Sequence, residues 1–182
     1  MASSIEKAFQ RHNEVVAASY NQLLPQVEEA ARILVSAREN AHTVFVCGNG
    51  GSAADAQHFA AEYTGRYKKE RSPLAAVALT TDTSALTAIG NDYGYEQVFA
   101  RQLEALADAG DVLVMLSTSG SSKNILAALS VAKIKNVKTI LLTGERGIQQ
   151  KNNVDICIAV PSAETARIQE VHEIIYHAWC EY

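Results

Sequence analysis

Two features that could do chemistry lie in one segment, Cys47–Arg66, whose sequence is CGNGGSAADAQHFAAEYTGR. A glycine-rich turn, Gly48–Ser52, stands there between an apolar run and a helical pattern. It predicts the start of a helix, capped by Ser52, where unpaired backbone N–H groups attract phosphate and other anions. Further along, His58 and Glu62 lie four residues apart on one helix face, which suits a general base or a pair of metal ligands.

A second loop carries five hydroxyl groups and a glycine, between an apolar run and another helical pattern. Such a loop at a helix N-terminus can surround a phosphate with neutral donors. Ser and Gly also favour ordinary turns, so a capped turn without a ligand is the alternative. The loop is Ser117-Thr118-Ser119-Gly120-Ser121-Ser122, directly before the helical pattern at Asn124.

The last helical pattern places Gln169, Glu173 and His177 four residues apart, along one stripe. Together with His58 and Glu62, Gln169 and His177 could complete a four-ligand site for Zn²⁺ or a similar divalent ion. A polar helix face of this kind can equally lie in solvent, and the spacing alone does not decide between the two interpretations.

The glycine turn also fits a dinucleotide-binding fingerprint, Gly48-x-Gly50-x-x-Ala53. That interpretation needs an acidic residue at the end of the next strand, about 20 residues on, to hold the ribose. Glu70 has the spacing but lies in a polar loop, and Asp82 follows a strand but is too distant. Dinucleotide binding is therefore disfavoured.

The elements that must position these residues alternate regularly along the chain. Five apolar runs are predicted strands, at 43–47, 75–79, 112–117, 138–142 and 156–160. Helical patterns follow them at 52–65, 84–109, 124–135, 145–152 and 164–182. This alternation predicts an α/β fold with a parallel sheet covered on both faces. Ligands bind such sheets at the carboxyl ends of the strands, where both loops are expected.

Residues 1–40 carry no strand pattern and predict a pair of helices, separated at Pro25, ahead of the main domain at 41–182. Apolar residues such as Ile5, Phe9 and Tyr20 recur at helical spacing in the first helix. We expect them to contact other subunits; the alternative is that they cover one edge of the sheet within the monomer.

Composition narrows the class of protein. The 182 residues suggest one domain, and a net charge of −4 without a Lys/Arg block disfavours nucleic acid and membrane surfaces as partners. Three widely spaced cysteines do not predict a disulfide framework. The first residues lack the apolar stretch of a signal peptide, so a cytoplasmic protein is expected.

Four segments together resemble the signature segments of the phosphoheptose isomerase family, which has the sugar-isomerase (SIS) fold: CGNGGSAADAQHFAAEYTGR, AIGNDYG, STSGSS and TARIQEVHEIIYH. The resemblance implies a five-stranded SIS domain with an N-terminal helical extension, and a cytoplasmic homotetramer. It also implies conversion of D-sedoheptulose 7-phosphate, a ketose, to the aldose D-glycero-D-manno-heptose 7-phosphate through a cis-enediol. This reaction would be the first step toward activated heptose for cell-surface polysaccharide.

The same resemblance implies roles for individual residues. It implies that Zn²⁺ would be held by His58, Glu62, Gln169 and His177. The isomerisation itself needs a base near two carbons and an acid near two oxygens, for which Glu62 and His177 are our candidates. The implied substrate contacts are Asn49, Gly50, Gly51, Ser52, Glu62, Asn91, Asp92, Ser117, Thr118, Ser119, Ser122 and Gln169.

Two alternatives share the fold. One is a non-catalytic module that binds a sugar phosphate or associates with a replication initiator. Such initiator-associating relatives lack the helix glutamate and the final histidine, which are present here as Glu62 and His177. The other is an isomerase of a pentose or hexose phosphate, because sequence does not show the depth of the pocket.

Overall fold

The computed structural model describes residues 3–182, and five parallel strands form one sheet in the order β2-β1-β3-β4-β5. The predicted α/β class and the five-stranded parallel sheet are confirmed. The strands are β1 (Val44–Gly48), β2 (Ala76–Ala78), β3 (Val112–Ser117), β4 (Lys138–Gly144) and β5 (Ile156–Val160). The helices are α1 (Ser4–Glu39), α2 (Gly51–Thr64), α3 (Thr83–Tyr93), α4 (Ala100–Leu106), α5 (Lys123–Ile134) and α6 (Thr165–Glu181), with 3₁₀ segments η1 (Tyr95–Gln97) and η2 (Glu145–Asn153).

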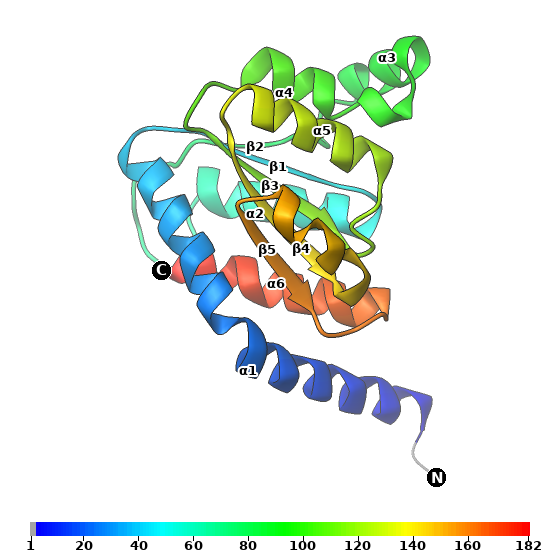
Figure 1. Ribbon diagram of the computed structural model, residues 1–182. Helices are drawn as coiled ribbons and strands as arrows, with labels where there is room; N and C mark the ends of the chain where they lie inside the picture. The colour runs from blue at the N-terminus through cyan, green and yellow to red at the C-terminus, as the bar shows by residue number, and fades with distance from the viewer. Residues whose placement is uncertain (1–2) are drawn as a thin grey trace.

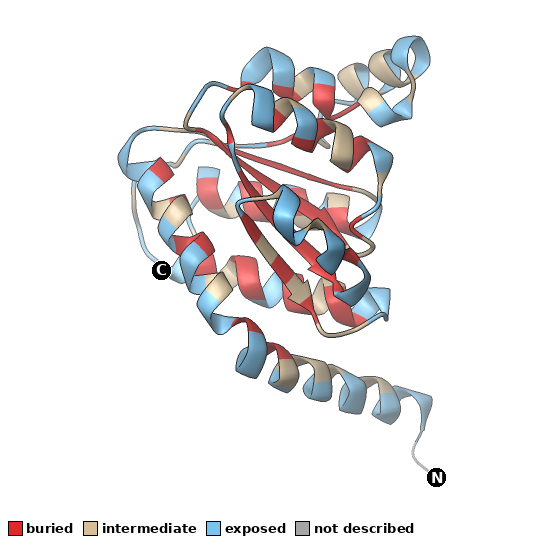
Figure 2. Cartoon of the chain, viewed as in Figure 1, coloured by how far each residue is buried: buried red, intermediate tan, exposed pale blue. Residues whose placement is uncertain are grey.

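Helices cover both faces of the sheet, as Figure 1 shows. Successive side chains of a strand point to opposite faces, so Val44 and Val46 pack with α1, α2 and α6, whereas Phe45 and Cys47 pack with α4 and α5. Every residue of β1 and β3 is buried, which the red strands of Figure 2 make plain. A strand buried on both faces has no polar alternation, which is why these strands were predicted from apolar runs.

The expected break at Pro25 is wrong, because α1 is one helix of 36 residues with Pro25 inside it. A proline in a helix removes one backbone hydrogen bond and bends the helix without necessarily ending it. Figure 1 shows α1 changing direction partway along its length. Its C-terminal half packs in the core through Leu23, Leu34 and their neighbours, and this packing offsets the lost bond.

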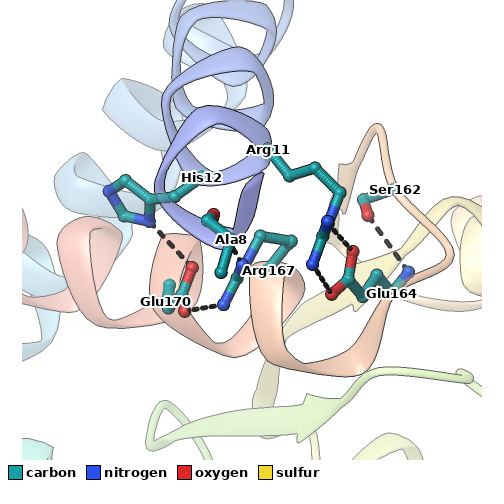
Figure 3. A network of polar contacts seen from close by, with 7 residues as sticks. All are labelled: Ala8, Arg11, His12, Ser162, Glu164, Arg167 and Glu170. Carbon is teal, nitrogen blue, oxygen red and sulfur yellow. Dashed lines mark hydrogen bonds and ion pairs between the residues drawn. The ribbon is translucent and has the colours of Figure 1, made fainter. Parts of the chain in front are cut away.

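Polar contacts hold the N-terminal half of α1 against α6 (Figure 3). Arg11 pairs with Glu164 at 3.0 Å, and His12 Nδ1 lies 2.7 Å from Glu170 Oε2. The buried Arg167 donates to the carbonyl of Ala8 at 2.8 Å and also pairs with Glu170. Much of α1 therefore packs against α6 and the core of its own chain.

Other side chains of α1 are not covered within the chain. Ile5, Phe9 and Tyr20 are 70%, 69% and 68% exposed. Figure 1 shows the start of α1 extending beyond the sheet and its helices. Among residues 3–182, no helix has the length and apolar content that crossing a membrane requires.

The helical stretch predicted for 84–109 is instead divided into α3, η1 and α4. Gly94, with a φ of 89°, ends α3 and turns the chain. Asp82 caps α3 by accepting a hydrogen bond from the backbone N–H of Ala85 at 2.9 Å.

Candidate active site

The two polar loops lie at the same edge of the sheet, beside the point where strand order reverses. From β1 the chain adds β2 on one side and then crosses to β3 on the other. Gly48 at the end of β1 is paired in register with Leu116 of β3. The glycine turn and the serine loop therefore leave neighbouring strand ends at a topological switch point, where α/β proteins bind their ligands.

The glycine turn owes its shape to two glycines. Gly50 caps α2 with a φ of 57°, which a side chain would disfavour. A Cβ at Gly48 would lie 2.3 Å from the carbonyl oxygen of Ser52, so no larger residue fits there. The predicted cap at Ser52 is wrong: Ser52 lies inside α2, is buried, and accepts a hydrogen bond from Gln169 Nε2 at 3.3 Å. Gly51 begins α2 and also lies beside Gln169.

The serine loop begins at the end of β3 and leads into α5. Ser117 is buried, and its Oγ lies 3.5 Å from Oγ of Ser122, which precedes α5 but does not cap it with its side chain. Ser119 Oγ accepts from both the backbone N–H and the hydroxyl of Ser121, at 3.3 and 3.0 Å. The carbonyl of Thr118 accepts from the N–H of Gly144 in the next strand at 3.1 Å. In both contacts with Ser121 the hydroxyl oxygen of Ser119 is the acceptor.

His58, Glu62 and His177 form a cluster whose ligand atoms all lie within 4.8 Å of one another. His58 Nε2 is 3.2 Å from Glu62 Oε1, and the rings of His58 and His177 meet edge to face at 4.9 Å. Two imidazole nitrogens and a carboxylate oxygen at this spacing suit a divalent metal ion such as Zn²⁺. The same groups can act as a general base and a general acid.

Residues of α6 and of a nearby loop support this cluster. The hydroxyl of Tyr176 lies 3.0 Å from His58 Nδ1, and Glu173 Oε1 lies 3.7 Å from the same nitrogen. A hydrogen on Nδ1 would leave Nε2 free to bind a metal ion beside Glu62. Tyr67 stacks on the ring of His177 at 5.4 Å.

Gln169, the fourth residue of the expected metal site, has its side-chain contact with a residue outside the cluster. It contacts Ser52 at the start of α2, and it precedes His177 by eight residues, about 12 Å of helical rise. Asn91 and Asp92 lie in the last turn of α3, are exposed, and bond to each other at 2.7 Å.

Several residues near the site carried no clear sequence signal. Asp55 lies one turn before His58, and its Oδ2 is buried without a hydrogen-bond partner among residues 3–182. Burial raises the pKa of Asp55 to about 6, the nearby Glu173 adds to the rise, and His58 opposes it. Asn124 and Tyr95 contact Asn49 in the glycine turn. A lone Asn at the start of a helix is the one hint the sequence offers for Asn124.

His172 is a fully buried residue of α6, and its Nε2 lies 3.3 Å from the carbonyl oxygen of Thr143 in β4. Burial lowers the pKa of His172 to about 4, although the carbonyl of Thr143 opposes the shift. Between pH 6.5 and 4 the unfolded chain therefore binds this proton and the folded chain does not. Stability rises with pH in that window and is lost as pH falls, by about 3 kcal/mol for this group alone.

Replacing His172 by glutamine should weaken the dependence of the free energy of unfolding on pH, because glutamine has no imidazole to protonate. Wild-type protein and His172→Gln are unfolded with urea at several pH values from 4 to 7.5. The variant should be less stable at pH 7.5, because it disturbs a packed site, but it should lose less stability on acidification. Two curves that stay parallel throughout would contradict the assignment.

Comparison with known proteins connects this geometry to a family. The sequence model of the SIS domain matches residues 9–144. A phosphoheptose isomerase of Aliarcobacter butzleri is 53% identical over 181 residues, which cover 100% of this chain and 96% of the relative. The solved phosphoheptose isomerases of Neisseria gonorrhoeae and Francisella tularensis are 45% and 40% identical, with TM-scores of 0.92 and 0.94. Their alignments cover 97% and 99% of this chain and 95% and 97% of theirs. The chain therefore belongs to the phosphoheptose isomerase family of SIS-domain proteins.

Proposed function

We propose that the protein interconverts D-sedoheptulose 7-phosphate and D-glycero-D-manno-heptose 7-phosphate, a ketose–aldose isomerisation in heptose biosynthesis. The observation that carries the proposal is the meeting of Glu62 from α2 and His177 from α6 in one cluster. A module that only binds a sugar phosphate needs neither group. The relatives are named phosphoheptose isomerases, and this name supports a seven-carbon sugar phosphate as the substrate.

The reaction moves one proton between C1 and C2 and another between O1 and O2, through a cis-enediol. It needs a base near both carbons and an acid near both oxygens. Glu62 takes the proton from one carbon and returns it to the other, and His177 serves the two oxygens. Because the two side chains come from different helices, they can face the substrate from two directions.

We also propose that one Zn²⁺ per chain is held by His58, Glu62 and His177, whose donor types and spacing fit this ion. When bound, the ion would supply Lewis-acid stabilisation to the developing enediolate oxygens. A glutamate that binds a metal ion tightly is a weaker base, so Glu62 would act on C1 and C2 through a carboxylate oxygen that is not bound to the ion.

Gln169 remains our candidate for a fourth ligand, and it would also contact substrate. Its separation from His177 along α6 favours a donor from a second copy of the chain over one from the same chain. The uncovered apolar side chains Ile5, Phe9 and Tyr20 of α1 support a homo-oligomer, for which we propose a tetramer. Free cysteines agree with a cytoplasmic enzyme.

In this assignment the glycine turn, through Asn49, Gly50, Gly51 and Ser52, holds the sugar. The serine loop, through Ser117, Thr118, Ser119 and Ser122, holds the 7-phosphate. Binding of this remote group fixes the orientation of the reacting carbons. Asn91 and Asp92, exposed at the end of α3, remain our candidates for further contacts to the sugar.

The direct test is incubation of the purified protein with sedoheptulose 7-phosphate, ribulose 5-phosphate and fructose 6-phosphate, each assayed for an aldose product. Turnover of the heptose phosphate, well above that of the other two, is expected. Binding without turnover of any of them would identify a non-catalytic module, and preference for a shorter sugar would identify a different isomerase.

Replacement of Ser119 by alanine should raise KM for sedoheptulose 7-phosphate roughly 10-fold or more, since a hydrogen bond to a charged group contributes about 1.5–3 kcal/mol. The change should leave kcat within a few-fold, because Ser119 lies at the phosphate end. Ser130→Ala, on the exposed side of α5, is the matched control. Steady-state kinetics measure both values, and an unchanged KM in Ser119→Ala would count against the phosphate assignment.

A further inference from the structure

Two asparagine side chains join the glycine turn to the helix that follows the serine loop. Asn49 Nδ2 donates to Asn124 Oδ1 at 2.9 Å, and Asn124 Nδ2 donates to Asn49 Oδ1 at 2.8 Å. Asn124 is only 3% exposed, whereas Asn49 is partly open to solvent. The residues are 75 positions apart in the sequence, so the pair bridges the switch point between β1 and β3.

The orientation of both amide groups follows from one unambiguous donor. The backbone N–H of Ile125 donates to Asn124 Oδ1 at 3.0 Å, and a backbone N–H cannot accept. The Asn124 atom at that position is therefore the oxygen, and its Nδ2 must face an acceptor on Asn49. This fixes Asn49 Oδ1 toward Asn124 Nδ2, and Asn49 Nδ2 toward Asn124 Oδ1.

A third residue completes the arrangement around Asn49. The hydroxyl of Tyr95 donates to Asn49 Oδ1 at 3.2 Å. An amide oxygen has two lone pairs, and here Asn124 and Tyr95 occupy both. The amide nitrogen has two hydrogens, of which only one is bonded among residues 3–182. Asn49 is thereby left with a single free N–H.

We propose that Asn124 is a positioning residue that, with Tyr95, fixes the Asn49 side chain as a hydrogen-bond donor to an oxygen of the sugar phosphate. Asn49 then cannot turn its oxygen toward the substrate, so the substrate atom that it contacts must be a hydrogen-bond acceptor. This inference rests on the proposed function for the identity of the substrate. It adds a residue and a direction of hydrogen bonding to that site.

Asn124→Asp tests the assignment with a change of one atom. The ionised carboxylate still accepts from Ile125 and Asn49, but its second oxygen faces Asn49 Oδ1 and repels it. At pH 8 we expect kcat/KM to fall roughly 10- to 100-fold, because a donor becomes a buried, repelling acceptor. Protonation of the aspartate restores an O–H donor, and burial favours the protonated form. The deficit relative to wild type should therefore shrink as pH falls toward 5.5.

Two further variants keep the test specific. Asn124→Ala should be impaired by a factor that does not change with pH, because it has no group to protonate. Asn152→Asp introduces the same charge in the exposed segment η2 and should follow the wild-type profile. A pH-independent deficit in Asn124→Asp, or none at all, would overturn the positioning role.

A second measurement does not depend on turnover. In protein labelled with ¹⁵N-asparagine, the side-chain N–H signals of the buried Asn124, and the one N–H of Asn49 that donates to it, should be among the slowest of the asparagine signals to exchange with solvent. Asn124→Asp at pH 8 should speed the exchange at Asn49. Rapid exchange at both residues in wild-type protein would disprove the pair itself. Absence of isomerase activity, with slow exchange preserved, would instead count against the proposed function alone.

Discussion

Replacing Glu62 by glutamine should lower kcat for sedoheptulose 7-phosphate by at least about 1000-fold while the protein stays folded. Glutamine has nearly the same shape as glutamate but cannot take a proton from carbon. Glu62 lies on the surface of α2 with part of its side chain accessible, so the substitution leaves the core untouched. Thermal unfolding is measured first, and the melting temperature of Glu62→Gln should be close to that of wild type.

Loss of rate alone would not separate a missing base from a missing metal ligand. The amide oxygen of glutamine can still bind an ion, so metal content should fall less than rate. Solvent exchange of the C1 hydrogen, followed by NMR in D₂O, reports proton removal directly and should stop in Glu62→Gln. Glu104→Gln, the same change on the exposed surface of α4, should behave as wild type. Near-normal turnover in Glu62→Gln would remove Glu62 from the mechanism.

The sequence predicted the features of this chain that depend on neighbouring residues. Strands β3 and β5 begin and end where their apolar runs predicted, because strands buried in a parallel sheet have apolar side chains on both faces. His58 and Glu62 share a helix face because four residues make about one turn. His177 was predicted to join them from spacing together with the family resemblance, and the structure brings the three together.

The errors arose where contacts distant in sequence decide the local structure. Pro25 would end many helices, but packing on either side of it keeps α1 continuous. Ser52 is a good cap by type, yet Gly50 can adopt a positive φ and lets α2 begin earlier. Asn124 shows no local pattern, since its partner Asn49 lies on another loop.

His177→Ala should reduce both metal content and turnover, and the pairing of the two losses is what identifies the site. His177 offers one of three donors within 4.8 Å, so its removal leaves two ligands on α2. Loss of a residue that merely supports a ligand costs about 10- to 100-fold in metal affinity, so loss of a ligand itself should cost at least about 100-fold. Turnover should fall by roughly 100- to 10,000-fold, because the acid is lost as well.

Metal analysis after extensive dialysis provides a measurement independent of activity. Wild-type protein should retain about one zinc ion per chain, since three or four protein ligands hold a single ion. His177→Ala should retain much less. His42→Ala, which removes a histidine beside Asp111 and away from the cluster, should retain the wild-type amount. Washed wild-type protein without a stoichiometric divalent ion, and without response to added Zn²⁺, would show that the cluster works as an acid–base pair and not as a metal site. In that case His177→Ala should still lose turnover, because the proton transfer between O1 and O2 requires its imidazole.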